Sequence, residues 1–301
     1  MTSGMLLFMT AVAHQSGTFT IDGKRVHRLG FGAMRLTGPG IWGEPADRDE
    51  CVRVVRRAVE LGVDLIDTAD SYGPYVSEEI LREALFPYPQ QLLIATKAGL
   101  VRTGPSQWHA VGRPAYLRQE AEMSLRRLGV ERLDLLQLHR PDPQVPLADQ
   151  VGELKALQDE GKVAAIGVSN VTVDQLEAAR EIADIVTVQN MYNLTNRRSQ
   201  DVLDYCATAG IGFIPWAPIA HGDLGEPGGP VDQVAGATGA TPGQVALAWL
   251  LALAPVVLPI PGTSSVAHLE GNIAAASVKL SDAEFEELGA VSLPGVGARA
   301  S

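Results

Sequence analysis

The stretch Leu133-Asp-Leu-Leu-Gln-Leu-His139 is followed by a helix-like segment over residues 147–160 and then by Val163-Ala-Ala-Ile-Gly-Val-Ser-Asn170. Both apolar runs are nearly continuous, which is typical of parallel strands covered on two faces. The segment between them carries Leu154 and Leu157 with the one-sided spacing of an amphipathic helix. The stretch therefore predicts a strand–helix–strand unit with polar residues at the carboxyl end of each strand.

The same alternation continues along most of the chain without a linker. Eight strands are expected, at 28–34, 63–69, 92–99, 133–139, 163–170, 185–192, 212–218 and 256–262. Eight helices are expected between and after them, at 48–61, 77–85, 114–128, 147–160, 172–182, 199–208, 241–253 and 266–276. Eight consecutive units of this kind predict the α/β class and a single-domain (β/α)8 TIM barrel.

The alternative α/β architecture is a doubly wound sheet, which would need a glycine-rich phosphate-binding turn after its first strand. Gly30-Phe-Gly32-Ala-Met-Arg35 begins in this way, but Arg35 stands at the third glycine position and no helix pattern opens there. We interpret these glycines as sites of close backbone packing, and we retain the barrel.

The N-terminal region is expected to contain a β-hairpin. Residues 19–26 alternate around Asp22-Gly23, a pair that favours a two-residue hairpin turn. We expect residues 1–18 to be a disordered extension and residues 19–301 to form the barrel domain. Residues 5–13 have the apolar character of a signal-peptide core, but no Lys or Arg precedes them, so secretion is not predicted.

Charge and composition exclude several kinds of partner. The 301 residues include 24 Lys and Arg against 35 Asp and Glu, a formal net charge of −11. Such a surface does not attract nucleic acid or anionic lipid, and the apolar runs are too short to span a membrane. The two cysteines form no disulfide framework, and no Cys/His cluster has zinc spacing. We expect a cytoplasmic protein with a small-molecule ligand and no metal; the oligomeric state is not predicted.

Polar residues at the predicted strand ends indicate the chemistry. Asp67 and Tyr72 follow the second strand, Lys97 ends the third and His139 ends the fourth. A buried ammonium is tolerated beside a carboxylate, and its charge lowers the pKa of a neighbouring phenol, which is about 10 in water. A neutral His139 N–H can point at a carbonyl oxygen that gains charge. This set predicts a site that protonates a carbonyl group as it receives a hydride.

These four residues, in this order, resemble the catalytic tetrad of the aldo-keto reductase superfamily, whose members reduce aldehydes and ketones with a nicotinamide cofactor in a (β/α)8 barrel. The resemblance extends from about Leu29 to Ala276. It implies that Tyr72 is the general acid in reduction and the base in alcohol oxidation. It also implies that the N-terminal hairpin closes the bottom of the barrel.

The resemblance further implies residues that bind the cofactor. Ser169, Asn170 and Gln189 match the ligands of the carboxamide, and Trp216 matches the aromatic residue that stacks on the nicotinamide. Gly222 falls in the pyrophosphate loop, within a glycine-rich segment over 221–239 that we expect to be a mobile cover.

The adenosine 2′-phosphate is expected at the helix N-terminus after the last strand, where backbone N–H groups favour an anion. The residues expected there are Gly262, Thr263, Ser264, His268 and Asn272. Gly262 and His268 stand where the family often has Lys and Arg. The resemblance therefore implies NADPH (NADP+) as the cofactor and leaves NADH open.

Three aromatic residues on the loops at this end, Trp42, Tyr75 and Trp108, are predicted to line a hydrophobic substrate pocket. Ordinary anchoring of the loops explains each of them equally well.

The predicted activity is that of an NAD(P)H-dependent aldo-keto reductase, and three alternatives remain. One is a nicotinamide-binding regulatory module without activity, similar to the channel β-subunits of the same family. A second is a lyase that forms a Schiff base at Lys97, against which Asp67 argues because it keeps the amine protonated. The third is a purely structural barrel in which Asp67 and Lys97 form an ion pair and nothing more.

Overall fold

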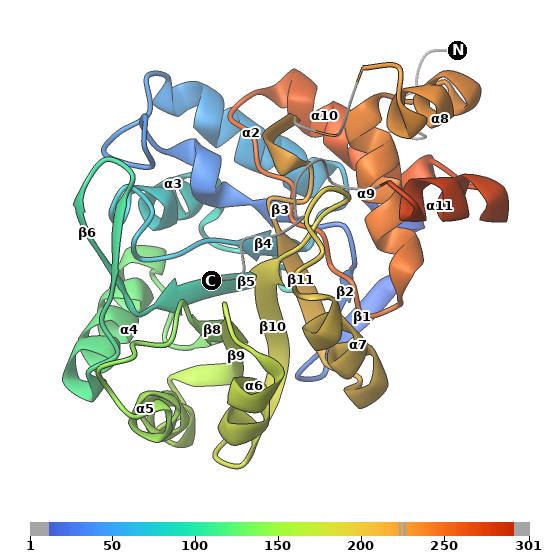
Figure 1. Ribbon diagram of the computed structural model, residues 1–301. Coiled ribbons are helices and arrows are strands. Elements are labelled where there is room, and N and C mark those ends of the chain that lie inside the picture. The colour runs from blue at the N-terminus through green and yellow to red at the C-terminus, as the bar shows by residue number, and fades with distance from the viewer. Residues whose placement is uncertain (1–11, 223, 225–226, 292–301) are drawn as a thin grey trace.

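Seven parallel strands form one curved sheet in the computed structural model, which describes residues 12–222, 224 and 227–291 (Figure 1). Their order across the sheet is β3 (Phe31–Gly32), β4 (Leu65–Asp67), β5 (Leu93–Ala98), β8 (Leu133–Leu138), β9 (Val163–Ser169), β10 (Ile185–Met191) and β11 (Gly212–Trp216). Each strand of this sheet pairs with the sheet strand that follows it in the chain, with β6 and β7 lying outside the sheet between β5 and β8, and this is the arrangement that repeated right-handed strand–helix–strand units produce.

The segment 256–261 closes the sheet into a barrel by bonding to both of its edges. The bonds are Phe213 N–H to Val256 O and Leu258 N–H to Phe213 O, both 2.8 Å, Gly30 N–H to Pro259 O, 2.9 Å, and Gly32 N–H to Pro261 O, 3.2 Å. The expected eighth strand thus occupies its place, but it forms only an isolated bridge between Phe213 and Val257. Its prolines have no N–H to donate, so a regular ladder cannot form.

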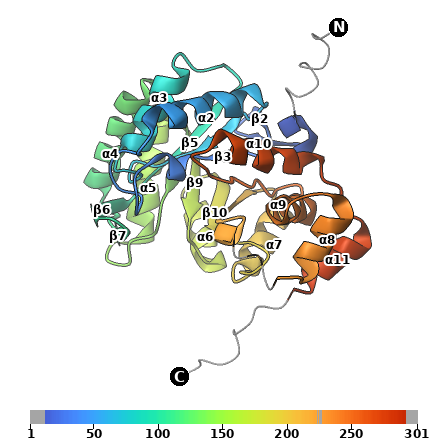
Figure 2. The same cartoon turned by 90° about the horizontal axis from the view of Figure 1, so that it is seen from above.

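Helices surround the strands as the sequence predicts (Figures 1 and 2). They are α2 (Arg48–Glu60), α3 (Val76–Leu85), α4 (Pro114–Leu128), α5 (Leu147–Asp159), α6 (Val173–Arg180), α7 (Gln200–Ala209), α9 (Pro242–Leu253) and α10 (Val266–Ala274). Capping boxes at Thr172 and Thr241 fix the starts of α6 and α9. The last helix of the described residues is α11 (Asp282–Gly289), capped by Ser281.

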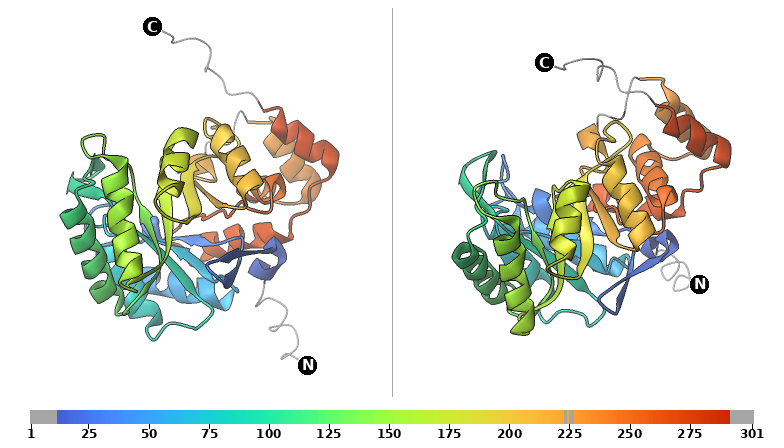
Figure 3. Two further views of the ribbon diagram at one scale, coloured as in Figure 1. Left: turned by 90° about the horizontal axis from the view of Figure 1, so that it is seen from below. Right: turned by 60° about the horizontal axis from the view of Figure 1, so that its bottom comes forward.

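Part of the expected mobile cover over 221–239 is a helix instead. α8 (Pro230–Thr238) begins at a proline, buries Val231 and Val234, and packs against α9 and α11. Figure 3 shows α8 and α11 side by side at the margin of the barrel. The expectation of a mobile cover is therefore wrong for 230–238, whereas residues 223, 225 and 226 lie outside the described residues.

The N-terminal hairpin closes one end of the barrel, as expected. Between β1 (Thr18–Ile21) and β2 (Lys24–His27), Asp22 and Gly23 have φ values of 46° and 76°, which a two-residue hairpin turn requires. Ile21 and Val26 are buried against side chains that fill the barrel, namely Leu65, Leu93, Ala95, Leu135, Ala165, Ile214, Leu258 and Ile260. Because this end is filled, a site has to lie at the other end, where the strands have their carboxyl termini.

Two further elements differ from expectation. The hairpin of β6 (Leu100–Gly104) and β7 (Gln107–Ala110) was not predicted, and it lies beside α4, across the barrel from β1 and β2 (Figure 1). Residues 12–18 are not a disordered extension, because η1 (Val12–Ser16) is a 3-10 helix with a buried Ala13; residues 1–11 lie outside the described residues. No helix in the described ranges is long and apolar enough to cross a membrane.

The two glycines interpreted as packing sites do meet other backbone. A Cβ on Gly32 would lie 2.6 Å from Ile260 O, and one on Gly30 would lie 2.8 Å from Leu65 O. We expect Gly32→Ala to lower the free energy of unfolding by about 1–3 kcal/mol, because the closing segment would have to move away. Urea unfolding measures this change.

The matched control is Gly271→Ala in α10, where a Cβ would meet nothing within 4 Å. This substitution is expected to be neutral or to stabilise by up to about 1 kcal/mol, the usual gain for alanine over glycine in a helix. Equal stability of the two variants would contradict the packing role of Gly32.

Candidate active site

The strand order brings the predicted tetrad together at the open end of the barrel. Asp67 is the last residue of β4, Lys97 lies in β5, and His139 directly follows β8, the next strand in the sheet. Tyr72 lies in the loop after β4 and is 6% exposed. Neighbouring parallel strands end at the same edge of a sheet, so residues far apart in the sequence meet here.

A buried ion pair forms the centre of the group. Lys97 Nζ lies 2.6 Å from Asp67 Oδ1, and the side chains are 0% and 3% exposed. The ammonium also donates to Thr68 O at 2.8 Å. Burial opposes the charge on Lys97, but Asp67 and Tyr72 outweigh this effect and raise the pKa of Lys97. The amine is therefore protonated at neutral pH.

The second oxygen of Asp67 is held by two amides. Gln189 Nε2 donates to Oδ2 at 2.8 Å and Gln137 Nε2 at 3.3 Å. Gln137, on β8, was not singled out in the sequence, because nothing in a strand of apolar residues marks the direction of one amide. Gln189, which the sequence predicts as a ligand of the cofactor carboxamide, donates from Nε2 to Asp67 Oδ2.

Tyr72 contacts the cation as expected, but its pKa is not lowered overall. Its hydroxyl lies 3.3 Å from Lys97 Nζ. Burial raises the pKa of Tyr72 by more than the charge of Lys97 lowers it. The expected net acidification is thus wrong for the protein without ligands. At neutral pH the phenol keeps its proton, and Lys97 is placed to stabilise the phenolate that remains when the proton leaves.

His139 is neutral at neutral pH. Burial, followed by the charge of Lys97, lowers the pKa of His139 well below its usual value. Its Nδ1 lies 3.2 Å from Ser71 Oγ, and its ring centroid lies 5.8 Å from that of Tyr72 at an interplanar angle of 83°. Ser71 can donate to Nδ1 in the tautomer that carries its proton on Nε2, or accept from Nδ1 in the other tautomer. Ser71 has no sequence signal beyond its place before Tyr72.

Three of the residues expected at the cofactor form one hydrogen-bonded group beside His139. Asn170 Nδ2 donates to His139 O at 3.0 Å and to Ser169 Oγ at 2.9 Å, and Asn170 Oδ1 accepts from Trp216 Nε1 at 3.1 Å. Asn170 has a φ of 60°, in the left-handed region that asparagine tolerates. Because its N–H is bonded to Asn170, the half-buried Trp216 ring is fixed in orientation. A fixed indole next to the tetrad fits an aromatic cofactor ring.

The expected phosphate end contains a carboxylate that the sequence did not reveal. Val266 N–H, in the first turn of α10, donates to Glu50 Oε1 of α2 at 3.2 Å, and this bond lowers the pKa of Glu50. Ser264 and His268 are exposed nearby, whereas Asn272 is half-buried and Thr263 Oγ1 accepts from Ser265 N–H. This end can bind a phosphate, with Glu50 as a competing negative charge.

Two glycines of the predicted cofactor site have different surroundings. A Cβ on Gly262 would lie 2.6 Å from Gly32 O, so this position serves the closure of the barrel. Gly222 ends η3 (Ala220–Gly222) with a φ of 94°, and a Cβ there would meet nothing within 4 Å. Open space and left-handed backbone at Gly222 suit a loop that approaches a ligand closely.

Two of the three aromatic residues predicted for the substrate pocket lie at the site. The Trp108 ring centroid lies 6.3 Å from the rings of both Tyr72 and His139. Trp42 bridges to Gly73, in the loop that carries Tyr72. Tyr75 faces away, since its ring packs under the Arg127 guanidinium at 4.1 Å and is 41% exposed.

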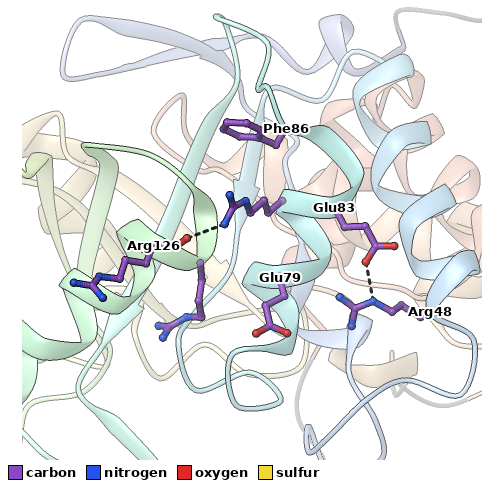
Figure 4. Close-up of a pocket in the computed structure, with 7 residues that line it drawn as sticks. Arg48, Glu79, Glu83, Phe86 and Arg126 are labelled. Atoms are coloured by element: carbon purple, nitrogen blue, oxygen red, sulfur yellow. Dashed lines mark hydrogen bonds and ion pairs between the residues drawn. The ribbon is translucent and has the colours of Figure 1, made fainter.

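A groove of about 660 Å³ lies elsewhere, on the outer surface of the helices (Figure 4). It is lined by Arg48, Glu79, Arg82, Glu83, Phe86, Arg126 and Arg127. Arg48 is paired with Glu83 at 2.8 Å, and Arg82 donates to Arg126 O at 3.0 Å. None of the tetrad lines this groove, so we place the chemistry at the strand ends.

Fold and geometry together define a barrel oxidoreductase with a tyrosine, a lysine–aspartate pair and a neutral histidine at the strand ends. Residues 28–292 match the model of the aldo/keto reductase family. The chain belongs to the aldo/keto reductase family, and it is an enzyme that oxidises or reduces carbonyl and alcohol groups.

Individual relatives agree with this assignment. The chain is 52% identical to an uncharacterized oxidoreductase of Schizosaccharomyces pombe over 276 residues, 92% of this chain and 90% of the relative. It is 43% identical to the pyridoxine 4-dehydrogenase of Escherichia coli over 284 residues, 92% of this chain and 99% of the relative.

Solved structures share the fold over nearly the whole chain. The glycerol dehydrogenase of Gluconobacter oxydans has a TM-score of 0.82 at 30% identity, covering 91% of this chain and 94% of its own. An aldo-keto reductase of Klebsiella pneumoniae, crystallised with NADPH, has a TM-score of 0.78 at 28% identity, covering 90% and 93%. These structures confirm the (β/α)8 barrel.

Behind the tetrad lies a buried acidic cluster of Asp70, Glu78 and Glu120, served by the single guanidinium of Arg127. Arg127 Nε lies 2.5 Å from Glu78 Oε2, and Nη2 lies 3.7 Å from Glu120 Oε2. Within the described residues no hydrogen bond of ordinary length reaches either carboxyl oxygen of Asp70. Burial, followed by the charges of Glu78 and Glu120, raises the pKa of Asp70 well above its usual value, and the charge of Arg127, followed by the Ser71 N–H, opposes this rise without cancelling it.

The raised pKa of Asp70 predicts a pH-dependent stability. In the unfolded chain the carboxyl ionises near pH ~3.9, whereas the native state holds its proton to a higher pH. The free energy of unfolding is therefore highest below pH ~3.9, where the carboxyl is protonated in both states. It falls as the pH rises from there toward the pKa of Asp70 in the native state. Asp70→Asn does not titrate, so its stability relative to wild type should rise by up to about 1.4 kcal/mol per pH unit in this window.

Denaturant unfolding between pH 4 and 9 measures this difference. The exposed Asp184, substituted by Asn, is the control and should leave the pH dependence of stability unchanged. Parallel curves for wild type and Asp70→Asn would show that Asp70 is ionised in the native protein.

Proposed function

We propose that the protein interconverts an aldehyde and the corresponding alcohol with NADP(H), and that Tyr72 is the proton donor in the direction of reduction. The observation that carries the proposal is the contact of the Tyr72 hydroxyl with Lys97 Nζ, at 3.3 Å, while that ammonium is 2.6 Å from Asp67. Ser169, Asn170 and Trp216 would hold the nicotinamide end of the cofactor, and the residues at the start of α10 the phosphate end.

The residues of this chain divide the work of proton transfer. When bound, the reduced nicotinamide supplies the hydride. Tyr72 donates its proton to the carbonyl oxygen as negative charge develops there, and Lys97 stabilises the phenolate that is left. The neutral His139 directs a ring N–H toward the same oxygen. In the reverse direction the Tyr72 phenolate accepts the proton of the alcohol.

A Schiff-base mechanism at Lys97 has less support. Its ammonium donates to Asp67 Oδ1, Thr68 O and the Tyr72 hydroxyl, which accounts for all three of its N–H groups. The raised pKa of Lys97 keeps the amine from acting as a nucleophile at neutral pH.

We propose further that the substrate carries an aromatic ring. Trp108 lies beside Tyr72 and His139, where it can pack against a ring attached to the reacting carbonyl. The similarity to the pyridoxine 4-dehydrogenase of Escherichia coli makes pyridoxal the first aldehyde to assay. Comparison with glyceraldehyde distinguishes this class from the glycerol-type substrates that the Gluconobacter oxydans neighbour's name indicates.

Tyr72→Phe tests the proton donor. We expect kcat for aldehyde reduction to fall by about 10²–10⁴, because the proton is no longer supplied at the site. The dissociation constant for NADPH should change little. Loss of NADPH absorbance measures turnover, and fluorescence titration measures binding.

Tyr192→Phe removes another buried phenol, which bonds to Gln200 and packs against the rings of Phe213 and Trp249, and serves as the control. Turnover by Tyr72→Phe at the wild-type rate would refute the role of Tyr72. Tight NADPH binding by the wild type without turnover of any aldehyde in a broad panel would favour the regulatory module.

Glu50→Gln tests the phosphate end. The Glu50 carboxylate at the start of α10 should repel a 2′-phosphate, so its removal is expected to tighten NADPH relative to NADH by about threefold to tenfold. Binding titrations with both cofactors measure the ratio. The control is Glu122→Gln, which removes the same charge from α4, where Glu122 is paired with Lys162, and should leave the ratio of the NADPH and NADH affinities unchanged. An unchanged ratio in Glu50→Gln would contradict the proposed repulsion.

A further inference from the structure

The Arg102 side chain, on β6, uses all its hydrogen-bond donors on backbone carbonyls. Nε donates to Gln107 O at 2.8 Å. The remaining four N–H groups reach Ile41 O at 2.5 Å, Ser71 O at 3.0 Å, Gly40 O at 2.8 Å and Gly104 O at 3.3 Å. A guanidinium has five N–H donors, so none is left for a ligand.

The same guanidinium lies over two aromatic rings. Arg102 Cζ lies 3.6 Å from the ring centroid of Trp108 and 5.8 Å from that of Trp42. Burial lowers the pKa of Arg102, but an arginine remains charged at any pH the protein tolerates. The cation–π contacts therefore persist across the working range of pH.

The carbonyl partners of Arg102 belong to three segments that are distant in the sequence. Gly40 and Ile41 follow β3, Ser71 follows β4, and Gly104 and Gln107 belong to the β6–β7 hairpin. In the described part of the chain these segments share no β-ladder and are joined by single contacts, such as Ser106 N–H to Gly40 O and the isolated bridge between Trp42 and Gly73. A single side chain thus ties together the loops that follow three neighbouring strands of the barrel, β3, β4 and β5.

Arg102 also reaches the tetrad through its partners. The carbonyl that it binds on Ser71 belongs to the residue whose hydroxyl contacts His139 Nδ1, and Tyr72 is the next residue. Trp108, which it stacks on, packs against the rings of Tyr72 and His139. Movement of the guanidinium would therefore shift the aromatic wall that Trp108 forms beside Tyr72 and His139, while Lys97 and Asp67 hold the Tyr72 hydroxyl in place.

We propose that Arg102 is the positioning residue that assembles the substrate pocket, and that it makes this pocket selective for an uncharged aromatic carbonyl compound. The proposal rests on the proposed carbonyl reduction. Since its donors are occupied, Arg102 does not bind a substrate carboxylate. It orients Trp42 and Trp108 as flat apolar surfaces beside the reacting group.

Arg102→Lys and Arg102→Met test the role in specificity. Both lose most of the bonds to the three segments, and the lysine keeps the charge. We expect KM for benzaldehyde to rise by about tenfold or more, while kcat/KM for propanal changes less than about threefold, because a small aldehyde does not use the aromatic walls. The Kd for NADPH should be unchanged.

Arg197→Lys is the matched control. Arg197 also stacks on a tryptophan, 4.7 Å from the Trp249 ring centroid, and donates to two backbone carbonyls. Unlike Arg102, it lies between β10 and α7, and the carbonyls that it binds, Leu288 O and Gly289 O, belong to α11. Loss of the Arg197 contacts should lower the melting temperature without changing the ratio of kcat/KM for benzaldehyde to kcat/KM for propanal. A similar value of this ratio in the Arg102 and Arg197 variants would overturn the proposal.

A further pair of substrates separates positioning from direct recognition of an anion. In Arg102→Lys and Arg102→Met, kcat/KM for benzaldehyde and kcat/KM for 4-carboxybenzaldehyde should fall by the same factor relative to wild type. A loss confined to the carboxylated aldehyde would show that Arg102 binds substrate directly, and would overturn the proposal.

Hydrogen exchange gives a readout that does not depend on activity. In Arg102→Met the amides of Gly43 and Ser106, which bond to Gly73 O and Gly40 O, should exchange at least about tenfold faster, whereas those of β8 and β9 keep their protection. Unchanged exchange at these loops would overturn the proposal even in a folded variant. Failure of the wild type to reduce any aldehyde would refute the proposed function and leave this measurement to decide the role of Arg102.

Discussion

The ion pair between Lys97 and Asp67 is the interaction on which the open end of the barrel depends. Either charge alone, at this depth, would cost several kcal/mol, and the pair is tolerated because further hydrogen bonds complete it. Those bonds come from Gln137 on β8 and Gln189 on β10, so four strands contribute to one charge pair. The strand order of the barrel therefore brings together the groups that hold Asp67 and keep Lys97 protonated.

Burial sets the protonation states of the groups around this pair. It keeps the proton on the Tyr72 phenol and keeps His139 neutral, whereas Asp67 preserves the charge of Lys97. In the proposed reaction this combination suits reduction, since one group holds a proton to give and the adjacent cation stabilises what remains. The rule that a cation acidifies its neighbour gives the correct sign for the effect of Lys97 on the pKa of Tyr72. It leaves out burial, which raises that pKa by more.

Periodicity, turn residues and strand-end residues were enough to predict the barrel, its N-terminal hairpin and the meeting of Asp67, Tyr72, Lys97 and His139, whereas the closure of the barrel by the hairpin was implied by the resemblance to the family. They could not predict the partners of Arg102, because these are carbonyls of three loops whose proximity exists only in the folded chain. The carboxylate of Glu50 at α10 is hidden for the same reason, since it comes from a helix more than two hundred residues away. α8 was missed because its glycine-rich surroundings resemble a loop, although Pro230 and its buried valines form a normal helix start.

The hairpin that carries Ile21 and Val26 closes one end of the barrel, and side chains fill the barrel interior. In the proposed reaction both reactants therefore enter, and both products leave, at the end where the strands have their carboxyl termini. In the proposed reaction, a molecule bound deeper in this opening is covered by one that binds above it. A short pair of strands at one pole of the molecule thereby limits access to the reacting groups at the other pole.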